Sequence, residues 1–445
     1  MTAAFVATTA RPRRFRRLLL PAGALLLVIG LLGILAGTRS EPSSPESTLA
    51  APSAAASDSG LQAISSLQNR LRTAPRDADS WGALGSLYVD QARVTADPTW
   101  YGKAQGALRK SLELKSAANV GALIGLGKLA NARHDFAGGL RWGERAGAAA
   151  PGRAAPYGVI GDALIELGRY PEAFAAIQRM VDLRPDLASY SRVSYARELQ
   201  GDVAGAAAAL DAAVHVADNP SDAAFATFQI GELRWNAGDL AGAADAYQRA
   251  TRLDPTFAPP AAALARLHAA EGDVAGAIGE YQAVIARVPA PQYVTELGEL
   301  YEVTGQHDLA AGQAQLLDVE ERLFHANGVN VDLETSLYDA DHGIRLADGL
   351  RRARAEYARR KSVFVADALA WQLHVNGRDA EALRLADEAL HLGTRSALFH
   401  FHRALIERSL GQVGAAHADL EQTLAINPHF SILHAPEARK ALTVA

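Results

Sequence analysis

The sequence predicts an all-α solenoid of about ten helix hairpins, and three observations support this fold class. A unit of two short helices recurs along most of the chain, apolar residues make up 49% of the 445 residues, and aromatic residues only 7%. One helix hairpin cannot bury its apolar face alone, so each unit requires neighbours of the same kind. A solenoid grows by adding units, so this length does not require several globular domains.

The clearest unit runs from Ala224 to Phe257. A first helix carries Gly231, a turn contains Gly238, and a second helix carries Ala243 and Tyr247 four residues apart. Small residues on both helices allow the two backbones to approach closely, and the larger side chains fill the groove against the next pair. This pattern predicts further copies along the chain.

Copies begin at intervals of 33 to 37 residues after a first step of 42. Their predicted starts lie near Ala78, Val120, Ala154, Leu187, Ala224, Ala258, Pro291, Gly328, Val363 and Ala397. The 34-residue signature W-x2-L-G-x2-Y, A-x3-F, P is matched in its first part by Trp81, Leu84, Gly85 and Tyr88. Most of the rest is matched by Tyr157, Gly161, Gly168, Tyr170, Ala173 and Pro185. The chain therefore resembles the tetratricopeptide repeat family, which implies a right-handed α-α superhelix.

The N-terminal part predicts a membrane anchor. Residues 1–17 form a short basic segment with five arginines, and residues 18–37 are an uninterrupted apolar run. Twenty helical residues span about 30 Å, the thickness of a hydrocarbon core. The arginines place the N-terminus in the cytoplasm and the rest of the chain outside, at a bacterial-type membrane. The alternative is a cleaved signal peptide, which would give a secreted protein.

Three further segments complete the predicted organisation. Residues 38–60 are rich in Ser, Pro and Ala and predict a disordered linker. Residues 61–327 form a first block, consisting of a half repeat that covers the N-terminal end and seven repeats. Residues 328–445 form a second block of three repeats and a C-terminal cap. The blocks meet after an extended helix over 313–325, which we expect to end at Asn327-Gly328.

Composition and motifs exclude several kinds of chemistry. The chain has no cysteine, and therefore no disulfide, thiolate nucleophile or Cys-based metal site. It also lacks a nucleotide loop, G-x-S-x-G and H-E-x-x-H. We therefore expect no enzyme activity, no cofactor and no bound metal.

The resemblance implies that partners bind on the concave face, which is lined by the first helix of each unit. Transferring the family's groove positions to this sequence gives a set of aromatic and acidic residues. The predicted groove consists of Asp162, Glu166, Tyr195, Glu198, Phe225, Phe228, Glu232, Trp235, Asn236, Glu299 and Glu302. Aromatic side chains supply contact area and carboxylates select the charge of the partner. The alternative is that Phe225 and Phe228 are core residues and that the acids form a solvated helix face.

The predicted groove favours a neutral-to-basic, partly apolar protein or peptide. The family's clamp for acidic chaperone tails needs Lys, Asn and Arg, whereas these positions here hold Gly158, Asp162, Ser191 and Tyr195. The chain has 44 basic and 49 acidic residues; without the five N-terminal arginines the balance is 39 against 49, or −10. Such a domain binds nucleic acid poorly because it cannot neutralise phosphates. We expect no small-molecule substrate either.

A metal-trafficking accessory is the alternative function, because seven of the thirteen histidines lie between His374 and His434. Carboxylates precede them in sequence, at Asp332, Glu334, Asp339 and Asp341, followed by His342. His400 and His402 would point about 200° apart on a helix and could not share one ion without other ligands. The competing interpretation is a connector in which the carboxylates pair with the following arginine-rich helix. The preferred function is a non-catalytic scaffold or adaptor outside the membrane.

Overall fold

The structure is a computed structural model that describes residues 54–444. This part of the chain contains 22 α-helices and no strand. The basic segment 1–17, the apolar run 18–37 and most of the linker 38–60 lie outside the described residues. Among the helices that are described, none combines the length and the apolar character that crossing a bilayer requires.

The helices are α1 (Ala54–Thr73), α2 (Ala78–Thr95), α3 (Trp100–Leu114), α4 (Val120–Ala132), α5 (Phe136–Ala149), α6 (Ala155–Glu166), α7 (Tyr170–Leu183), α8 (Leu187–Leu199), α9 (Val203–His215), α10 (Pro220–Asn236), α11 (Leu240–Leu253), α12 (Ala258–Glu271), α13 (Val274–Arg287), α14 (Pro291–Val303), α15 (His307–Ala326), α16 (Asp332–Asp341), α17 (Leu346–Arg359), α18 (Val363–Val375), α19 (Asp379–Leu390), α20 (Ala397–Ser409), α21 (Val413–Ile426) and α22 (His434–Val444).

Ten helix pairs, from α2/α3 to α20/α21, follow one another along the chain and pack against their neighbours. Each pair begins within four residues of a predicted unit start. α1 packs on α2 at one end and α22 on α21 at the other. α1 begins at Ala54, within the segment predicted as linker, rather than at Leu61. α15 is extended to 20 residues and is followed by Asn327 as its C-cap, as the sequence predicts.

Small residues on the first helix of a pair let the second helix approach. A Cβ atom on Gly231 would lie within 3.0 Å of the Tyr247 ring, which is fully buried. Gly161 stands in the same relation to Ile177. Real Cβ atoms do not come this close, so a larger residue would push the two helices apart.

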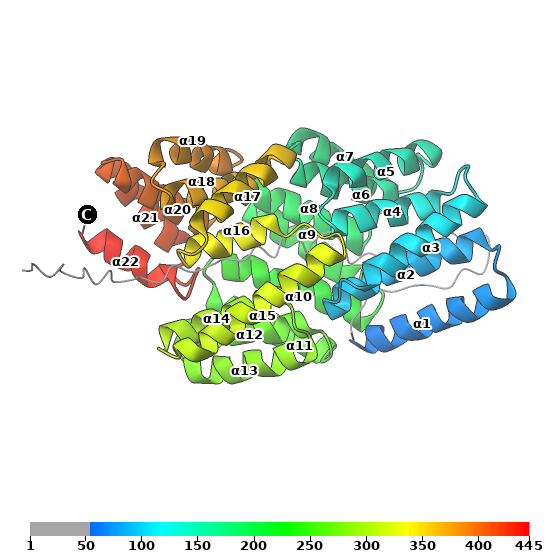
Figure 1. The fold of residues 1–445 in the computed structure, drawn as a ribbon, viewed down its shortest axis with the longest axis horizontal. Coiled ribbons are helices and arrows are strands. Elements are labelled where there is room, and N and C mark those ends of the chain that lie inside the picture. The colour runs from blue at the N-terminus through cyan, green and yellow to red at the C-terminus, as the bar shows by residue number, and fades with distance from the viewer. Residues whose placement is uncertain (1–53, 445) are drawn as a thin grey trace, which may run out of the picture.

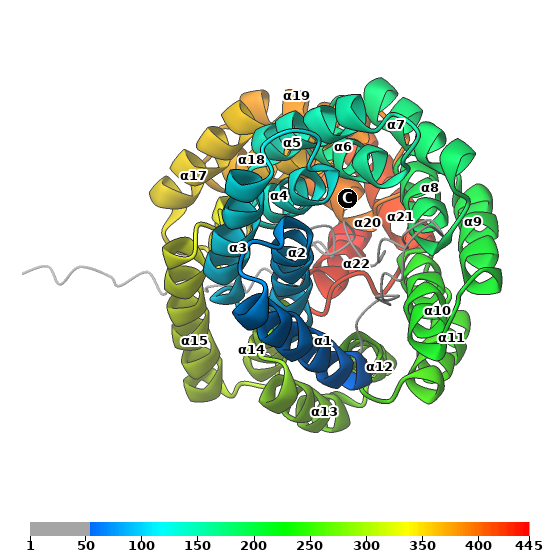
Figure 2. The same ribbon diagram turned by 90° about the vertical axis from the view of Figure 1, so that its right-hand side faces the viewer.

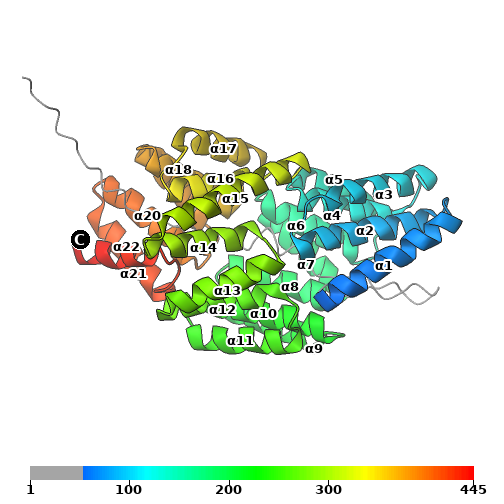
Figure 3. The same cartoon turned by 60° about the horizontal axis from the view of Figure 1, so that its bottom comes forward.

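The pairs wind into a superhelix whose first helices face inward. In Figure 2, which looks along the winding axis, α8, α10, α12 and α14 form the inner ring and α9, α11, α13 and α15 the outer one. The same view shows α1 crossing the opening of the ring. Figures 1 and 3 show the C-terminal helices, α16 to α22, displaced along the axis from the N-terminal helices.

The second turn of the superhelix rests on the first in a fixed register. Four hydrogen bonds between a side chain and the backbone join residues that are 192 to 196 positions apart in sequence. They are His134 Nδ1 with the carbonyl of Asn330, the Val363 amide to Tyr170 Oη, Thr394 Oγ1 to the Leu199 carbonyl, and Asn427 Nδ2 to the Trp235 carbonyl. One turn therefore takes about six helix pairs, and α6 meets α18.

Glycine is required where the two turns touch. Gly168 ends α6 with φ +74°, in the left-handed region that side chains disfavour. A Cβ atom there would also lie within 3.0 Å of the Lys361 carbonyl oxygen in the other turn. Gly305, with φ +75°, holds the equivalent place after α14, where no atom of the described residues lies within 4 Å of such a Cβ atom. The backbone contact thus exists only where a second turn covers the first.

Candidate binding cavity

A cavity of about 520 Å³ lies on the inner side of the superhelix. Its walls come from the first helices of seven consecutive pairs, α2 to α14, together with parts of α15 and α16. Because each inner helix contributes one or two turns to the wall, a bound molecule could contact many units at once. The cavity is therefore a product of the superhelix and not of any single pair.

Aromatic side chains form much of the apolar wall. Tyr195, Phe225, Phe228, Phe257 and Tyr293 all line the cavity. The Phe228 ring also packs on Tyr247 and Phe257, with centroids 5.9 and 5.6 Å apart. Only 5% of Phe225 and 7% of Phe228 is exposed. These phenylalanines are therefore buried core residues that also form part of the cavity wall.

Two of the carboxylates in the wall are held by arginines of the next inner helix. Asp162 on α6 accepts two hydrogen bonds of 2.7 Å from the guanidinium of Arg192 on α8. Glu232 on α10 accepts 2.6 Å hydrogen bonds from Arg266 on α12 and from the Tyr247 hydroxyl. Such bidentate and networked pairs fix side chains in place, which makes this part of the wall rigid.

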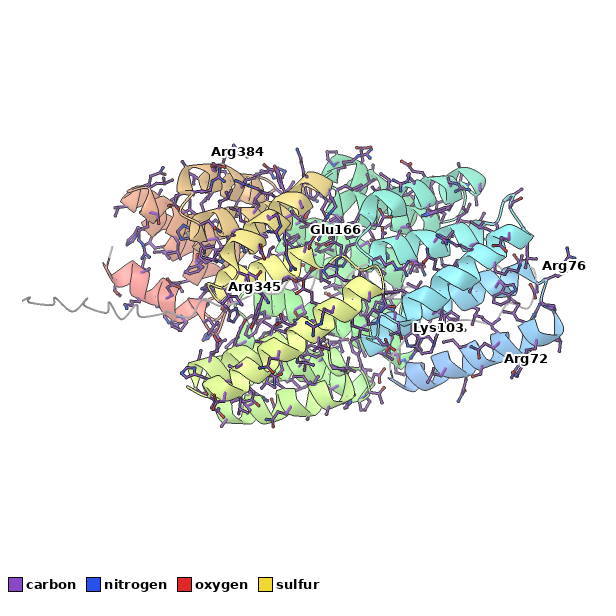
Figure 4. All side chains as sticks on the ribbon, in the orientation of Figure 1. Arg72, Arg76, Lys103, Glu166, Arg345 and Arg384 are labelled. Carbon is purple, nitrogen blue, oxygen red and sulfur yellow. The ribbon has the colours of Figure 1, made fainter. Side chains whose placement is uncertain are left out.

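A third carboxylate is held by the second turn. Glu166 pairs with Arg360, and the same guanidinium contacts Glu356. Burial raises the pKa of Glu166, against the opposing effect of the Arg360 charge. Figure 4 shows Glu166 in the middle of the molecule, whereas the exposed Arg384 lies at its edge. The cavity and the contact between the turns thus share a residue.

Glu320 differs from these carboxylates because its Oε2 atom has no hydrogen-bond partner among the described residues. The side chain comes from the extended helix α15, lines the cavity, and is 8% exposed. Burial alone raises its pKa from 4.5 to about 7. This desolvated carboxyl group in the cavity wall could accept a hydrogen bond from a ligand.

The structure brings together six of the eleven predicted groove residues. Those that line the cavity are Asp162, Glu166, Tyr195, Phe225, Phe228 and Glu232. Those that do not line it are Glu198, Trp235, Asn236, Glu299 and Glu302.

The five others have partners elsewhere. Trp235 is 2% exposed and lies beneath the Arg266 guanidinium, 4.5 Å from its ring centroid. Asn236 donates a 2.9 Å hydrogen bond to Glu198. Glu299 is buried, and Glu302 lies 3.7 Å from the His342 ring.

Sequence reasoning did not identify Arg192, Arg266, Tyr293 and Glu320 as cavity residues. The two arginines follow the carboxylates they hold by 30 and 34 residues, one repeat length, and this spacing is a signal in the sequence. Glu320 lies on the second helix of its pair, which normally faces outward. The extension of α15 beyond the usual length is the only sign in the sequence that it reaches the inner side.

The carboxylates ahead of the histidine-rich part pair largely as the connector interpretation expects. Arg345 bonds Asp339 and Asp318 at 2.8 Å, and Arg359 bonds Asp332 at 2.6 Å. His400 and His402 point to different partners, as their spacing requires. His400 faces Asp419 at 2.8 Å, whereas His402 is buried against Asp367 at 3.0 Å.

A protein-family model supports the repeat assignment over part of the chain. The tetratricopeptide repeat family model matches residues 194–256 and 262–318. No curated protein matches the chain. Among solved structures, a tetratricopeptide repeat protein of Parabacteroides merdae is 16% identical, with 58% of this chain and 98% of that chain covered and a TM-score of 0.34.

Two other solved structures are similar to this chain. A thermophilic TPR protein of Thermus thermophilus is 20% identical over 37% of this chain and 91% of that chain, with a TM-score of 0.35. The human IFIT1 dimer with m7Gppp-AAAA is 14% identical over 74% of this chain and 76% of that chain, with a TM-score of 0.47.

Proposed function

We propose that this tetratricopeptide repeat protein is a non-catalytic scaffold that holds an extended, partly apolar peptide segment of a partner protein in its inner cavity. One observation carries the proposal: the cavity has aromatic walls from consecutive inner helices and a buried carboxyl group with an unpartnered oxygen. In the right-handed superhelix that the family resemblance implies, the ligand would follow the inner surface from unit to unit.

The wall is suited to binding without reorganisation. Asp162 and Glu232 are already fixed by Arg192 and Arg266, and Phe228 is fixed by its contacts with other rings. Binding to a preformed surface avoids the entropy cost of ordering side chains. The peptide supplies most of the ordering cost, so the affinity depends on its sequence.

Glu320 selects the charge of the peptide. A lysine or arginine side chain of the ligand would donate a hydrogen bond to this carboxylate and compensate its desolvation. An acidic side chain at the same place would remain unpaired. The proposal therefore favours peptides with one basic residue among apolar ones, in agreement with the net charge of −10 outside the N-terminal arginines.

The same features speak for a scaffold and against an enzyme. The carboxylates Asp162 and Glu232 are both engaged in ion pairs with arginines. A catalytic site needs titratable groups that converge on a reacting atom. We infer that the cavity binds its ligand without changing it.

The test compares two fluorescent peptides in anisotropy titrations. Both carry the same apolar residues around one position, which is lysine in one peptide and the neutral isostere norleucine in the other. Wild-type protein should bind the lysine peptide roughly tenfold more tightly, the effect of one hydrogen bond to a charged group. Glu320→Gln should remove this preference.

The control for this experiment is Glu144→Gln on α5, where the carboxylate is exposed on the outer surface. This variant should keep the wild-type preference for lysine. The proposal fails if Glu320→Gln keeps the preference as well, or if a library of such peptides yields no binder to the wild-type protein.

We further propose that residues 18–37 anchor the chain in a membrane, with the superhelix outside the cytoplasm. The support is the 20-residue apolar run and the five arginines before it. Membrane fractionation should recover the protein with the lipid fraction, and N-terminal sequencing should find an uncleaved chain. A mature N-terminus after residue 37 would favour the secreted alternative.

A further inference from the structure

Three buried side chains from separate helices meet near the C-terminal end of the superhelix. Asp341 ends α16, His402 lies in the middle of α20, and His434 begins α22. One potential ligand atom from each lies within 4.8 Å of those of the other two. Only 2% of Asp341, 1% of His402 and none of His434 is exposed. The cluster lies outside the peptide cavity and plays no part in the proposed peptide binding.

The donor set suits a first-row divalent metal. Two imidazoles and a carboxylate are ligands that Zn²⁺ accepts, at about 2.0–2.2 Å. The Nε2 atom of His434 lies 3.3 Å from Oδ1 of Asp341. Two ligands of a tetrahedral zinc ion lie about 3.3 Å apart, as these bond lengths require. The His434 Nε2 and Asp341 Oδ1 atoms are therefore already at the separation that two zinc ligands require.

The third donor, His402, is oriented as a metal-binding histidine is. Its Nδ1 atom lies 3.0 Å from both oxygens of the buried Asp367 carboxylate. Donation of the Nδ1 hydrogen to Asp367 leaves the lone pair on Nε2, and a carboxylate behind the ring makes that nitrogen a stronger ligand. Yet Nε2 has no hydrogen-bond partner anywhere in residues 54–444. An unpartnered buried nitrogen of this kind calls for an occupant.

Neighbouring aromatic side chains hold all three donor residues in place. The indole Nε1–H of Trp371 donates a 2.7 Å hydrogen bond to Oδ1 of Asp341. The Trp371 ring stacks on the His402 imidazole, with centroids 4.3 Å apart and planes 10° from parallel. The His434 ring packs against Phe401 at 4.7 Å. A rigid shell of this kind fixes the geometry of a metal site before the metal enters.

We propose that Asp341, His402 and His434 bind one Zn²⁺ ion, which joins the C-terminal helix α22 to α16 and α20. A buried ion pair between Asp341 and His434 explains their contact but leaves the oriented Nε2 of His402 without a function. With three protein ligands, the fourth position is left to a water molecule. Because the side chains are almost inaccessible, the ion would be retained as part of the fold, which distinguishes this site from a trafficking site that releases its metal.

The test measures metal uptake by the untagged full-length chain in detergent. The protein is first treated with a chelator to strip bound metal, and the chelator is then removed. Wild-type protein should take up one equivalent of Zn²⁺ in calorimetry, with a rise in melting temperature as the ion stabilises the folded state. Co²⁺ in place of Zn²⁺ should give the visible absorption bands of a tetrahedral site. The variants Asp341→Asn and His402→Gln should each take up no Zn²⁺ and show no tetrahedral Co²⁺ absorption bands.

Two further variants separate ligation from structural damage. His400→Gln, two residues from His402 on the same helix, removes an imidazole that faces Asp419 and should leave uptake unchanged. Asp367→Asn should keep the stoichiometry and lower the affinity 10- to 100-fold, the usual effect of losing a partner of a metal-bound histidine. The proposal is overturned if wild-type protein takes up no Zn²⁺ at micromolar concentrations, or if the ligand variants take up as much as the wild type.

Discussion

The Glu166 carboxylate on α6 pairs with the Arg360 guanidinium, 194 residues later in the chain. This ion pair is buried and joins one turn of the superhelix to the next, beside the Gly168–Lys361 backbone contact and the Tyr170–Val363 hydrogen bond. Arg360 also pairs with Glu356 and lies 4.8 Å from the Phe136 ring centroid. The contact between the turns is therefore polar as well as apolar.

Arg360→Met should destabilise the protein by about 3–5 kcal/mol, because the buried Glu166 loses its arginine partner and Glu356 keeps only Arg359. Denaturant unfolding followed by circular dichroism measures this change. The matched control is Arg169→Met, which removes an arginine from an exposed pair with Glu172 a few residues away. The control should produce little change in stability. Equal effects of the two substitutions would mean that the buried pair does not join the turns.

Gly168→Ala and Gly305→Ala form a second matched pair. Both glycines have φ near +75°, so both substitutions cost about 1 kcal/mol from backbone strain alone. Only at Gly168 would the new Cβ atom overlap the Lys361 carbonyl oxygen. We expect Gly168→Ala to be more destabilising by at least about 1 kcal/mol, in the same unfolding measurement. A smaller effect at Gly168 than at Gly305 would contradict the contact between the turns.

Glu320 should make stability depend on pH. Its pKa is raised from 4.5 in the unfolded chain to about 7 in the folded protein, because the charged form is desolvated. Its contribution to stability is therefore complete below pH 4.5 and is lost as the pH rises through about 7. When the pH rises from 4 to 8, the free energy of unfolding of Glu320→Gln should therefore increase by about 3 kcal/mol relative to that of the wild type. An unchanged difference across this range would show that Glu320 is solvated or paired.

Trp235→Ala should destabilise the fold rather than change partner binding alone. The sequence places Trp235 in the groove, but the side chain is buried beneath Arg266 and does not line the cavity. Removing a buried tryptophan costs about 3–5 kcal/mol. The half-buried Trp142, which is covered by Arg145 on one face, provides the control, and Trp142→Ala should cost less. Equal melting temperatures of Trp235→Ala and the wild type would contradict this prediction and favour a position for Trp235 in the groove.

The sequence predicts the units well because each depends on local packing. Gly231 and Tyr247, sixteen residues apart, already define one hairpin, and every pair starts within four residues of the predicted place. The stacking of the turns could not be predicted. It depends on a small rotation repeated over six pairs, and Gly168 and Gly305 look alike in sequence although only one is covered.

The candidate cavity was predictable in part for a related reason. Phe225, Phe228 and Glu232 were found because first helices face inward in every unit. Trp235 instead packs in an apolar cluster formed by its own unit and the following one, and Arg266 of the following unit lies over its ring. Glu320 is not predicted from the sequence because it lies on the second helix of its pair, and second helices normally face outward.

The most direct measurement is a cross-link between the two turns, and a chain without cysteine suits it. Arg395 lies beside the Gly201 turn, with its Cγ atom 3.6 Å from where a Gly201 Cβ atom would be. Because Gln200 adjoins Gly201, the paired substitutions Gln200→Cys and Arg395→Cys should be joined by a short bismaleimide cross-linker, detected as a linked peptide by mass spectrometry. Gln200→Cys with His429→Cys, which places the partner one unit out of register, should not. Absence of the first link, or equal yields of both, would contradict the stacked superhelix.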